Sequence, residues 1–599
     1  MKQRLAAALV MIAALLVAAL GLAAPASADD ATASATSAEK KANKAKKQKN
    51  KKCNKYKKVK KNKGASKKQK NKAKKSCNKA KKNLKKANKK VKKQNAQYFD
   101  VCKHGCKYNT IQKGVNAAGE WQKKKNGKAN PDKVNKTVAT VRVQPGTYTE
   151  GVLIHGSQKG MNFNGLKIIG VKNNLKPNPN ARKVILQGKN AKTVVKGTPG
   201  WVQGDPTKIA ANNAIEARNV DDIVFKNMWA KNYLNNTFFV WASNLEADNE
   251  HCADFVMDNL VSSDTKSYGL FSRNCYGGKF LNSEGWNHGD SALYIGETPC
   301  DEFDWTNKGP NPGPCQADPN WTIVKNMTSH QNSLGYSGTN SKYVKIMDSN
   351  WYNNGAGIVP NTLDSEKFEP SGQLILENNN IFWNNYNYYS DGSTFTTVIG
   401  NGNPTGIGIM LYGTDGVVAK NNNIFGNEQW GAATFSGPEL FEVNEGDDAK
   451  NMNNQFIDNN MGRNGVDPNG NYDFFSDASG GGNCWSGNNS STFAPGNGSV
   501  PVSTIYPACP QPTVINDDVS AVDFGAGLQI NTAYLSPLEP WRDLTTIFGL
   551  AEVRPSSLQE CSWNITSPHP SFSDNGVTYK EERALPVGDQ ACQELEDRP

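Results

Sequence analysis

The middle of the chain repeats one short pattern of apolar and polar positions. In this pattern an apolar residue is followed by two variable positions and an asparagine. The copies are Val224–Asn227, Val256–Asn259, Ile323–Asn326, Ile375–Asn378 and Val418–Asn421, with looser copies at Lys279–Asn282 and Ile346–Ser349. The steps from Asn259 to Asn282 and from Asn326 to Ser349 are both 23 residues. This period predicts a solenoid, in which each coil buries its apolar residues against the next coil.

A second pattern, of alternating apolar residues, repeats in step with the first and predicts a short strand in each coil. Its copies are Gly269–Arg273, Ala292–Gly296, Leu334–Gly338, Gly357–Asn361 and Gly408–Tyr412. Because successive side chains of a strand point to opposite faces, alternate residues should point inward. The expected inward residues are Leu270, Leu293, Ile358 and Ile409. The expected outward residues are Phe271, Tyr294, Tyr336, Val359 and Met410, with Arg273, Asn361 and Tyr412 two positions further on.

The segment before the repeats predicts a helix and then a strand. Ile111, Val115, Ala118 and Trp121 fall on one face of a helix, and an apolar strand follows at 138–143. We expect this helix to cap the open end of the solenoid and to cover its exposed strand edges.

These segments resemble a known superfamily. The runs Thr110-Ile-Gln, Val115-Asn-Ala-Ala and Val141-Arg-Val-Gln-Pro-Gly-Thr-Tyr-Thr-Glu150, followed by the Asn-bearing coils, are similar to the right-handed parallel β-helix proteins of the pectate-lyase-like (pectin lyase fold) superfamily. Gly289–Gly296 and the residues from Asn340 to Asn361 resemble a secreted bacterial branch of it. The resemblance covers about residues 98–484 and implies an all-β, right-handed parallel β-helix.

The resemblance also implies a class of substrate. Members of the superfamily mostly act on acidic polysaccharides, as lyases, hydrolases, epimerases or esterases. The catalytic motif sets of the polygalacturonases and mannuronan epimerases are absent from this chain, and so is the Arg-x-Pro-x-x-Arg run of pectate lyases. The resemblance therefore specifies the fold but transfers no catalytic residue.

The charge of the chain is divided between two unlike parts. The 599 residues include 70 Lys+Arg and 55 Asp+Glu, a formal net charge of +15. Residues 29–95 alone hold 29 lysines against three acids, a net charge of +26. Residues 1–28 add +2, so the remaining 504 residues carry a net charge of −13.

The basic arm, residues 29–97, is expected to be disordered or a helical hairpin. It is either a solvated spacer or an adhesive segment for a polyanion. Because only Tyr56 could stack on bases, we do not expect specific binding to nucleic acid.

The two ends of the chain indicate export. Residues 1–28 read as a signal peptide with an Ala26-Ser27-Ala28 cleavage site, although a retained membrane anchor is the alternative. No second apolar run is long enough to span a membrane, so we expect a secreted protein with no transmembrane segment after signal removal. We also expect it to be a monomer. Residues 485–599 read as a Pro/Ser/Gly-rich linker and a disulfide-pinned C-terminal segment.

Twelve cysteines in an exported chain predict disulfides. Two Lys-rich helices that turn at Gly64 would bring Cys53 and Cys77 together, and Cys252 and Cys275 lie one period of 23 residues apart, on successive coils. A metal site is the alternative for the cluster around His104. The predicted pairs are Cys53–Cys77, Cys102–Cys106, Cys252–Cys275, Cys300–Cys315, Cys484–Cys509 and Cys561–Cys592.

The densest group of candidate catalytic side chains is Glu284–Asp290, with Glu297 seven residues later. His288 is a candidate general acid or base near neutral pH. Asp290 and Glu297 are candidates for an acid–base pair, or for oxygen ligands of Ca²⁺, which lyases of the superfamily use to neutralise the substrate carboxylate. The structural alternative is a turn whose polar side chains bind backbone groups between coils.

Other candidates lie on the predicted strands. Lys342 and Arg273 are alternative bases for removing the proton beside a uronate carboxylate. The outward aromatic residues could form a sugar platform, with Arg273 binding uronate carboxylates, or they could lie beneath the insertions at 299–320 and 362–371. The candidate substrate-binding residues are Phe271, Tyr294, Tyr336, Asn361 and Tyr412.

Two functions remain compatible with the sequence. One is an extracellular enzyme that acts on an acidic polysaccharide, by lyase-type β-elimination. The other is a non-catalytic protein of the cell envelope, which binds a glycan or cell-wall polymer through its β-helix and is tethered to the cell surface by its basic arm.

Overall fold

The computed structural model describes the chain in segments. They are residues 44, 47–94, 97–129, 135, 137–189, 191, 212–242, 252–265, 267–298, 303–304, 309–310, 320–363, 366–385, 406–427, 430–435, 450–465, 468–469, 472–476, 480–489, 494–495, 507–509, 573–574 and 577–578. The chain divides into two compact units, Met1–Tyr98 and Phe99–Pro599. The predicted signal peptide and most of the predicted C-terminal segment lie outside the described residues.

Residues 47–94 of the first unit form a helical hairpin. Residues 47–61 form one helix and α3 (Lys67–Gln94) forms the other. The Ser66 hydroxyl accepts a hydrogen bond from the Gln69 N–H (3.2 Å), and the Gln69 side chain accepts one from the Ser66 N–H (2.9 Å), a reciprocal cap that starts α3. The predicted Cys53–Cys77 disulfide joins the two helices. Of the predicted arm, residues 29–97, the part at 47–94 is helical, and most of residues 29–46 lie outside the described residues.

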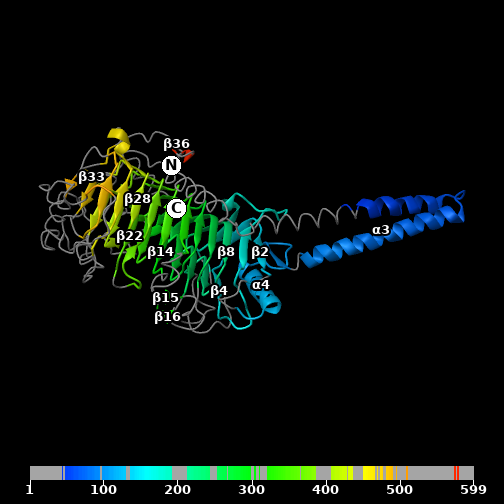
Figure 1. Cartoon of the computed structure of the whole chain (residues 1–599). Helices are drawn as coiled ribbons and strands as arrows, with labels where there is room; N and C mark the ends of the chain where they lie inside the picture. Colours follow the sequence, from blue (N-terminus) through cyan, green and yellow to red (C-terminus); the bar gives the residue numbers. More distant parts are fainter. Residues whose placement is uncertain are drawn as a thin grey trace, which may run out of the picture. The chain divides into compact units, whose positions relative to one another are not determined.

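The second unit is a parallel β-helix, in which successive coils stack their strands side by side (Figure 1). In a typical coil the chain passes through two strands of a 20-stranded sheet and then one strand of an 11-stranded sheet. The predicted fold class, an all-β right-handed parallel β-helix, is confirmed.

The strands of the 11-stranded sheet are β4 (Val152–His155), β7 (Ile215–Arg218), β9 (Phe238–Trp241), β11 (Leu270–Arg273), β14 (Ser291–Gly296), β19 (Leu334–Thr339), β22 (Ala356–Asn361), β26 (Ile407–Tyr412), β30 (Trp430–Phe435), β33 (Tyr472–Ser476) and β35 (Ala494–Pro495). The strands of the 20-stranded sheet are β1 (Tyr98–Val101), β2 (Thr140–Val143), β3 (Gly146–Tyr148), β5 (Lys167–Gly170), β6 (Val184–Gln187), β8 (Val224–Lys231), β10 (Val256–Thr265), β12 (Lys279–Leu281), β13 (Glu284–His288), β17 (Thr322–Lys325), β18 (Thr328–His330), β20 (Val344–Met347), β21 (Asn350–Tyr352), β24 (Ile375–Glu377), β25 (Asn380–Phe382), β28 (Val418–Lys420), β29 (Asn423–Phe425), β31 (Gln455–Ile457), β32 (Asn460–Met461) and β34 (Cys484–Ser486).

Among the described residues, three strand pairs form small sheets of their own, and two short 3₁₀ helices are present. The pairs are β15 (Phe303–Asp304) with β16 (Gly309–Pro310), β23 (Ser371–Gly372) with β27 (Thr414–Asp415), and β36 (Ser573–Asp574) with β37 (Val577–Thr578). The 3₁₀ helices are η2 (Ala181–Lys183) and η5 (Gly462–Gly465). Parallel pairing continues through β34 and β35, past the predicted end of the β-helix at residue 484.

The repeated asparagine marks the turn between the two strands of each coil in the 20-stranded sheet. Its residues adopt the left-handed conformation, with φ between 50° and 61°, which asparagine and aspartate tolerate better than most residues. They are Asn227, Asn259, Asn282, Asn326, Asp348, Asn378, Asn421 and Asp458. The predicted copy at Ile346–Ser349 is therefore displaced by one residue: Asp348, not Ser349, occupies the turn, because Thr322 pairs with Val344 and this coil is 22 residues long.

A different set of asparagines lies inside the β-helix and connects its coils. The backbone N–H and the side-chain amide of Asn384 both donate to Oδ1 of Asn427 in the next coil, at 3.1 and 3.0 Å, and the amide also donates to the Trp351 carbonyl of the preceding coil. Two such ladders run along the interior. One contains Asn332, Asn354, Asn384, Asn427 and Asn469, and the other contains Ser349, Asn379, Asn422, Asn459 and Asn488.

One end of the β-helix is covered by α4 (Ile111–Asn126), which packs on β2 and β4. Thr110 caps the helix, and both carboxylate oxygens of Glu150 accept hydrogen bonds from its first N–H groups, those of Ile111 and Gln112. Of the face predicted to be buried, Ile111, Val115 and Ala118 are fully buried, and Trp121 is partly buried.

Disulfides join neighbouring segments of the β-helix. Cys252–Cys275 links two successive coils, as the spacing of one period predicted, and Cys102–Cys106 and Cys484–Cys509 are also present. The predicted pairs Cys300–Cys315 and Cys561–Cys592 lie outside the described residues. In the part of the chain that the structure describes, no helix is long and apolar enough to cross a membrane.

The interior ladders predict a large stability cost for removing one amide. Asn384→Ala removes the side-chain partner of the Asn354 N–H and of the Trp351 carbonyl inside the core, and it removes one of the two hydrogen bonds that Oδ1 of Asn427 accepts from Asn384. We expect a loss of about 3 kcal/mol in the free energy of unfolding, measured by urea denaturation followed by circular dichroism. The exposed Asn173→Ala is the matched control and should change it by less than about 0.5 kcal/mol. Equal effects of the two substitutions would contradict the role of the ladder.

Candidate active site

The outer face of the 11-stranded sheet carries a compact aromatic cluster. The strand register places Phe239, Phe271 and Tyr294 next to one another on β9, β11 and β14. The rings of Phe239 and Phe271 are stacked with centroids 4.3 Å apart. Tyr268 lies against both Phe271 (4.6 Å) and Tyr294 (4.7 Å). Two of the predicted substrate-binding residues, Phe271 and Tyr294, therefore point outward from the sheet, but they are only 7% and 2% exposed. The Tyr294 hydroxyl reaches Glu366 in the insertion at 362–371, and the partly exposed rings of the cluster are Tyr268 and Trp241.

The prediction that Tyr336 belongs to this surface is wrong. Tyr336 pairs with Leu293 and Ile358, so it points into the core, where it is fully buried. Ser337 occupies the outward position beside Tyr294. The cause is a shift of one residue, because β19 pairs Leu334 with Ser291 and the next coil is 22 residues long. Such a shift exchanges the two faces of a strand.

Charged groups lie beside the aromatic cluster. Arg273, at the end of β11, forms an ion pair with Glu297, and 41% of the Arg273 side chain is exposed while Glu297 is almost completely buried. The hydrogen bond from Arg273 to Glu297 is the main cause that raises the pKa of the guanidinium above its usual value. The Tyr294 hydroxyl donates a hydrogen bond to the carboxylate of Glu366. Two predicted residues, Arg273 and Glu297, are thus brought together.

Asp290 lies at the start of β14 and has an unusual protonation equilibrium. The pKa of its carboxyl group is raised to about 7, mainly by burial and also by the neighbouring negative charge of Glu366, although hydrogen bonds from the hydroxyls of Tyr268 and Ser291 act in the opposite direction. Its Oδ1 atom has no hydrogen-bond partner within the described residues. Burial and the nearby carboxylates raise the pKa of the Tyr268 phenol well above its usual value. At neutral pH, Asp290 can therefore both accept and donate a proton, while Tyr268 remains a neutral hydroxyl.

His288 lies inside the β-helix and not on this surface. Its ring nitrogens bind the hydroxyls of Ser262 (2.9 Å) and Thr265 (2.6 Å), and its backbone N–H donates to Oδ1 of Asn332 at 3.0 Å, which makes it the first residue of an interior ladder. It is fully buried, and burial lowers the pKa of its imidazole to about 3. Because it has no surface for contact with a substrate, we correct the prediction of a catalytic acid or base: His288 is a structural residue.

The other predicted residues lie elsewhere on the coils. Lys342 is buried, and its Nζ donates to the carbonyl oxygen of Glu369 at 3.1 Å. Asn361 and Tyr412 are aligned on β22 and β26, as predicted, but are 8% and 1% exposed, so little of either side chain is available for a substrate.

The predicted Ca²⁺ ligands do not form a complete site by themselves. The Glu297 carboxylate is bound to Arg273, and Asp290 lies beside Tyr268 and Ser291. Within the described part of the chain no group of three or more His, Cys, Asp or Glu side chains could hold a metal ion. Since Ca²⁺ takes 6–8 oxygen ligands, these residues do not fit it, and we derive no step that depends on it.

The sequence patterns did not identify several residues of this region, and Phe239, beside Phe271 in the register, is one of them. Tyr268 directly precedes the strand pattern at 269–273, and Glu366 falls in an insertion without a period, so neither carried a signal. Glu216 accepts a hydrogen bond from the indole N–H of Trp241 (2.9 Å), and burial raises the pKa of Glu216. Trp241 lies next to Arg273 in the strand register and could have been found by extending the outward ladder one coil backward.

Comparisons with known proteins identify relatives of the fold only. No protein-family model matches the chain, and no curated protein matches it. Among solved structures, the A-module of mannuronan C-5 epimerase AlgE6 of Azotobacter vinelandii is similar over 63% of this chain and 89% of its own, with 11% identity and a TM-score of 0.38. The catalytic domain of a GH87 α-1,3-glucanase in complex with tetrasaccharides matches 66% of this chain and 65% of its own, with 11% identity and a TM-score of 0.34. The periplasmic alginate epimerase AlgG matches 54% of this chain and 71% of its own, with 12% identity and a TM-score of 0.27.

The raised pKa of Asp290 predicts a pH-dependent effect on stability. An unfolded aspartate has a pKa of about 3.9, so the folded state binds this proton more tightly and Asp290 destabilises the fold progressively as the pH rises from about 4 to about 7. Asp290→Asn cannot ionise, so its melting temperature relative to the wild type should rise over that range and level off above it. Thermal unfolding monitored by circular dichroism at several pH values measures this difference. Glu120→Gln, on the exposed surface of α4, controls for the loss of one negative charge. A difference that does not change with pH would contradict the assignment.

Proposed function

We propose that this protein is a secreted enzyme of the pectin lyase fold superfamily that cleaves an acidic polysaccharide by β-elimination, and that it acts as a monomer. The observation that carries the proposal is the meeting of a partly exposed guanidinium, a carboxyl group that titrates near neutrality and an aromatic cluster whose partly exposed members are Tyr268 and Trp241. The partly exposed rings of Tyr268 and Trp241, which pack on the buried Phe239, Phe271 and Tyr294, supply an apolar surface for a sugar ring, and Arg273 supplies a partner for its carboxylate.

Each group then has a defined role in the elimination. The carboxylate of the uronate binds to Arg273, which reduces its negative charge and acidifies the adjacent C–H bond. Ionised Asp290 removes that proton, a C=C double bond forms, and the bond to the leaving glycosidic oxygen breaks. The neutral hydroxyl of Tyr268 donates a proton to that oxygen. Arg273 also addresses an electrostatic problem, because the chain outside the basic arm and the signal peptide carries a net charge of −13 and would otherwise repel a polyuronate.

A second candidate function is non-catalytic adhesion, and the helical hairpin favours it. Residues 47–94 hold 25 lysines and no acidic residue, and the lysines between 47 and 82 lie mostly on exposed positions of two helices joined by Cys53–Cys77. A dense positive charge is therefore displayed on a folded element. We infer that this hairpin holds the protein to an anionic cell-wall polymer. Such a tether is compatible with an enzyme as well as with a purely binding protein.

The elimination mechanism predicts loss of activity on substitution of Asp290 or Arg273. A panel of uronic-acid polymers, followed by the ultraviolet absorbance of unsaturated products with added Ca²⁺ and with a chelator, identifies the substrate and tests the metal requirement. Asp290→Asn and Arg273→Lys should each lower kcat/KM by about 100-fold or more. The control is Asp221→Asn: the carboxyl group of Asp221 also has its pKa raised to about 7, but it hydrogen-bonds the Ala253 N–H at a coil bend instead of joining the cluster. Absence of unsaturated product on every polymer would leave adhesion as the function.

The hairpin predicts salt-dependent binding that is separate from catalysis. Deleting residues 29–95 should abolish retention on an anionic polymer at low salt and leave turnover of soluble substrate unchanged. Cys53→Ser combined with Cys77→Ser keeps every lysine, so this control should still bind. Retention that persists after the deletion and does not depend on salt would refute the tether.

A further inference from the structure

A second aromatic and charged cluster lies on the 20-stranded sheet, away from Asp290 and Arg273. Trp229 of β8 and Trp286 of β13 are both partly exposed, with ring centroids 6.0 Å apart. Arg182 reaches them from η2, and its guanidinium lies 4.8 Å from the ring centre of Trp286 and 5.5 Å from that of Trp229. The fold thus gathers two indoles and a guanidinium from segments as much as 104 positions apart in the sequence.

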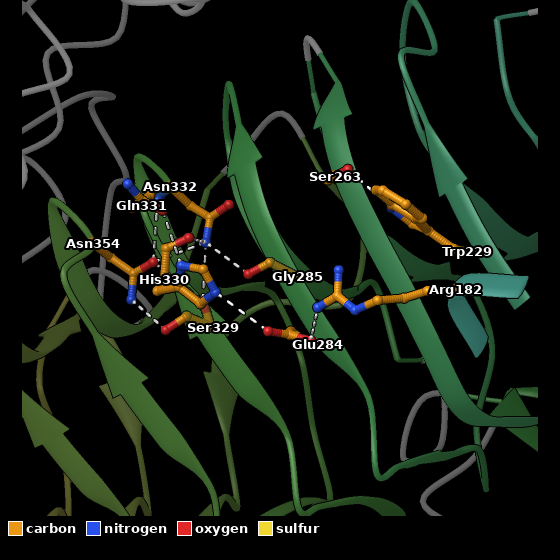
Figure 2. Close-up of polar contacts among 10 residues, drawn as sticks. All are labelled: Arg182, Trp229, Ser263, Glu284, Gly285, Ser329, His330, Gln331, Asn332 and Asn354. Carbon is orange, nitrogen blue, oxygen red and sulfur yellow. Dashed lines mark hydrogen bonds and ion pairs between the residues drawn. The ribbon is translucent and has the colours of Figure 1, made fainter. Parts of the chain in front are cut away.

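The polar groups of the cluster hold Arg182 in place. Its Nη2 forms an ion pair with Oε2 of Glu284 at 2.6 Å, and Oε1 of Glu284 lies 3.5 Å from Nε2 of His330, as Figure 2 shows. Within the described residues, Nη2 is the one guanidinium nitrogen of Arg182 with a polar partner, and 41% of the Arg182 side chain is exposed. The guanidinium is therefore oriented, and its remaining N–H donors are available to a ligand.

The indole rings of Trp229 and Trp286 are also positioned to contact a ligand. The Trp229 N–H donates to the Ser263 hydroxyl at 3.0 Å (Figure 2), which fixes the ring and satisfies its polar edge. Nζ of Lys231 lies 4.4 Å from the centre of the same ring. Two cations beside two partly exposed indoles combine an apolar surface for the C–H face of a sugar ring with positive charge for its carboxylate.

We propose that this cluster, formed by Arg182, Trp229, Lys231, Glu284, Trp286 and His330, is a second binding site for an acidic polysaccharide. It goes beyond the proposed function and does not depend on it, since binding here needs no turnover. The charges of Arg182 and Lys231 select an acidic glycan over a neutral one. Single-stranded nucleic acid is disfavoured, because a strand of bases needs a longer series of exposed rings and cations, and the chain outside the basic arm and the signal peptide is acidic.

The fold connects this site to the candidate active site through one coil. Glu284 and Trp286 belong to β13, and Asp290 follows β13 directly, before β14. A polysaccharide held on the 20-stranded sheet would therefore be kept close to the 11-stranded sheet of the same coil, which raises its effective concentration there.

Isothermal titration of the full chain with polygalacturonate oligosaccharides tests the proposal. Trp229→Ala and Arg182→Gln should each weaken binding by about tenfold, since each removes one half of the recognition. Trp321→Ala is the matched control, because Trp321 is also a partly exposed indole with a lysine, Lys345, 4.2 Å from its ring centre. Among the described residues its aromatic neighbour is Tyr343, and neither a second indole nor an arginine lies beside it. The basic arm contributes equally to all variants. Trp229→Phe keeps the packing if the alanine variant does not fold.

The outcomes separate the proposal from its alternatives. Weaker binding in the two site variants with an unchanged Trp321→Ala supports it. Equal binding by all variants, or an equal loss in the control, overturns it. If the two site variants lose binding to neutral dextran oligosaccharides as much as binding to polygalacturonate, the assignment to an acidic glycan is overturned. It is also overturned if they lose binding to single-stranded DNA while binding to polygalacturonate is unchanged. Because turnover is not measured, failure of the proposed lyase activity leaves this result intact.

Discussion

The architecture depends on the need to pair every buried amide between coils. A side-chain amide inside a β-helix cannot reach water, so its donors and acceptor must find partners in the coils before and after it. Asn354 and Asn384 meet this need in both directions, because each binds Oδ1 of the asparagine ahead and a carbonyl oxygen behind. Such a ladder permits one register only. The register in turn decides which residues of β11 and β14 face outward, so the ladders position the aromatic surface and Arg273 without contacting either.

Around Asp290, on the 11-stranded sheet, the dominant effect is instead the repulsion between buried negative charges. Asp290 and Glu366 lie near each other where burial already disfavours charge, and the resulting shift in the pKa of Asp290 makes it useful near neutrality. Arg273 compensates part of the negative charge in this region by forming an ion pair with Glu297. On the other sheet, Arg182 and Glu284 form an equivalent pair beside tryptophans. An acidic β-helix thus presents its few exposed guanidinium groups next to aromatic rings, where they combine with an apolar surface.

The sequence predicted the fold more fully than the site. The 23-residue step identified the coils and the Cys252–Cys275 link, because both depend on period alone. Whether a side chain points inward or outward changes with a register shift of a single residue. One coil of 22 residues, in place of 23, therefore made the prediction put Tyr336 on the outer face when it lies in the core. His288 is the last residue of β13 and follows Asn287, whose left-handed backbone (φ 57°) interrupts the strand alternation, so an interior residue looked like a catalytic one. Tyr268 and Glu366 enter the site through tertiary proximity alone, which no local pattern records.

The interior ladder also has a direction and two distinct ends. His288 begins one ladder with two hydroxyl partners for its ring, and Asn469 ends it by donating to Oδ1 of Asp473. Between these ends the same contacts recur although 30 residues separate Asn354 from Asn384 and 43 separate Asn384 from Asn427. A complete coil is therefore an exchangeable module, and the residues between rungs can lengthen or shorten freely. Evolution, or an engineer, could remodel the glycan-facing segments or add coils between the two ends while the scaffold stays the same.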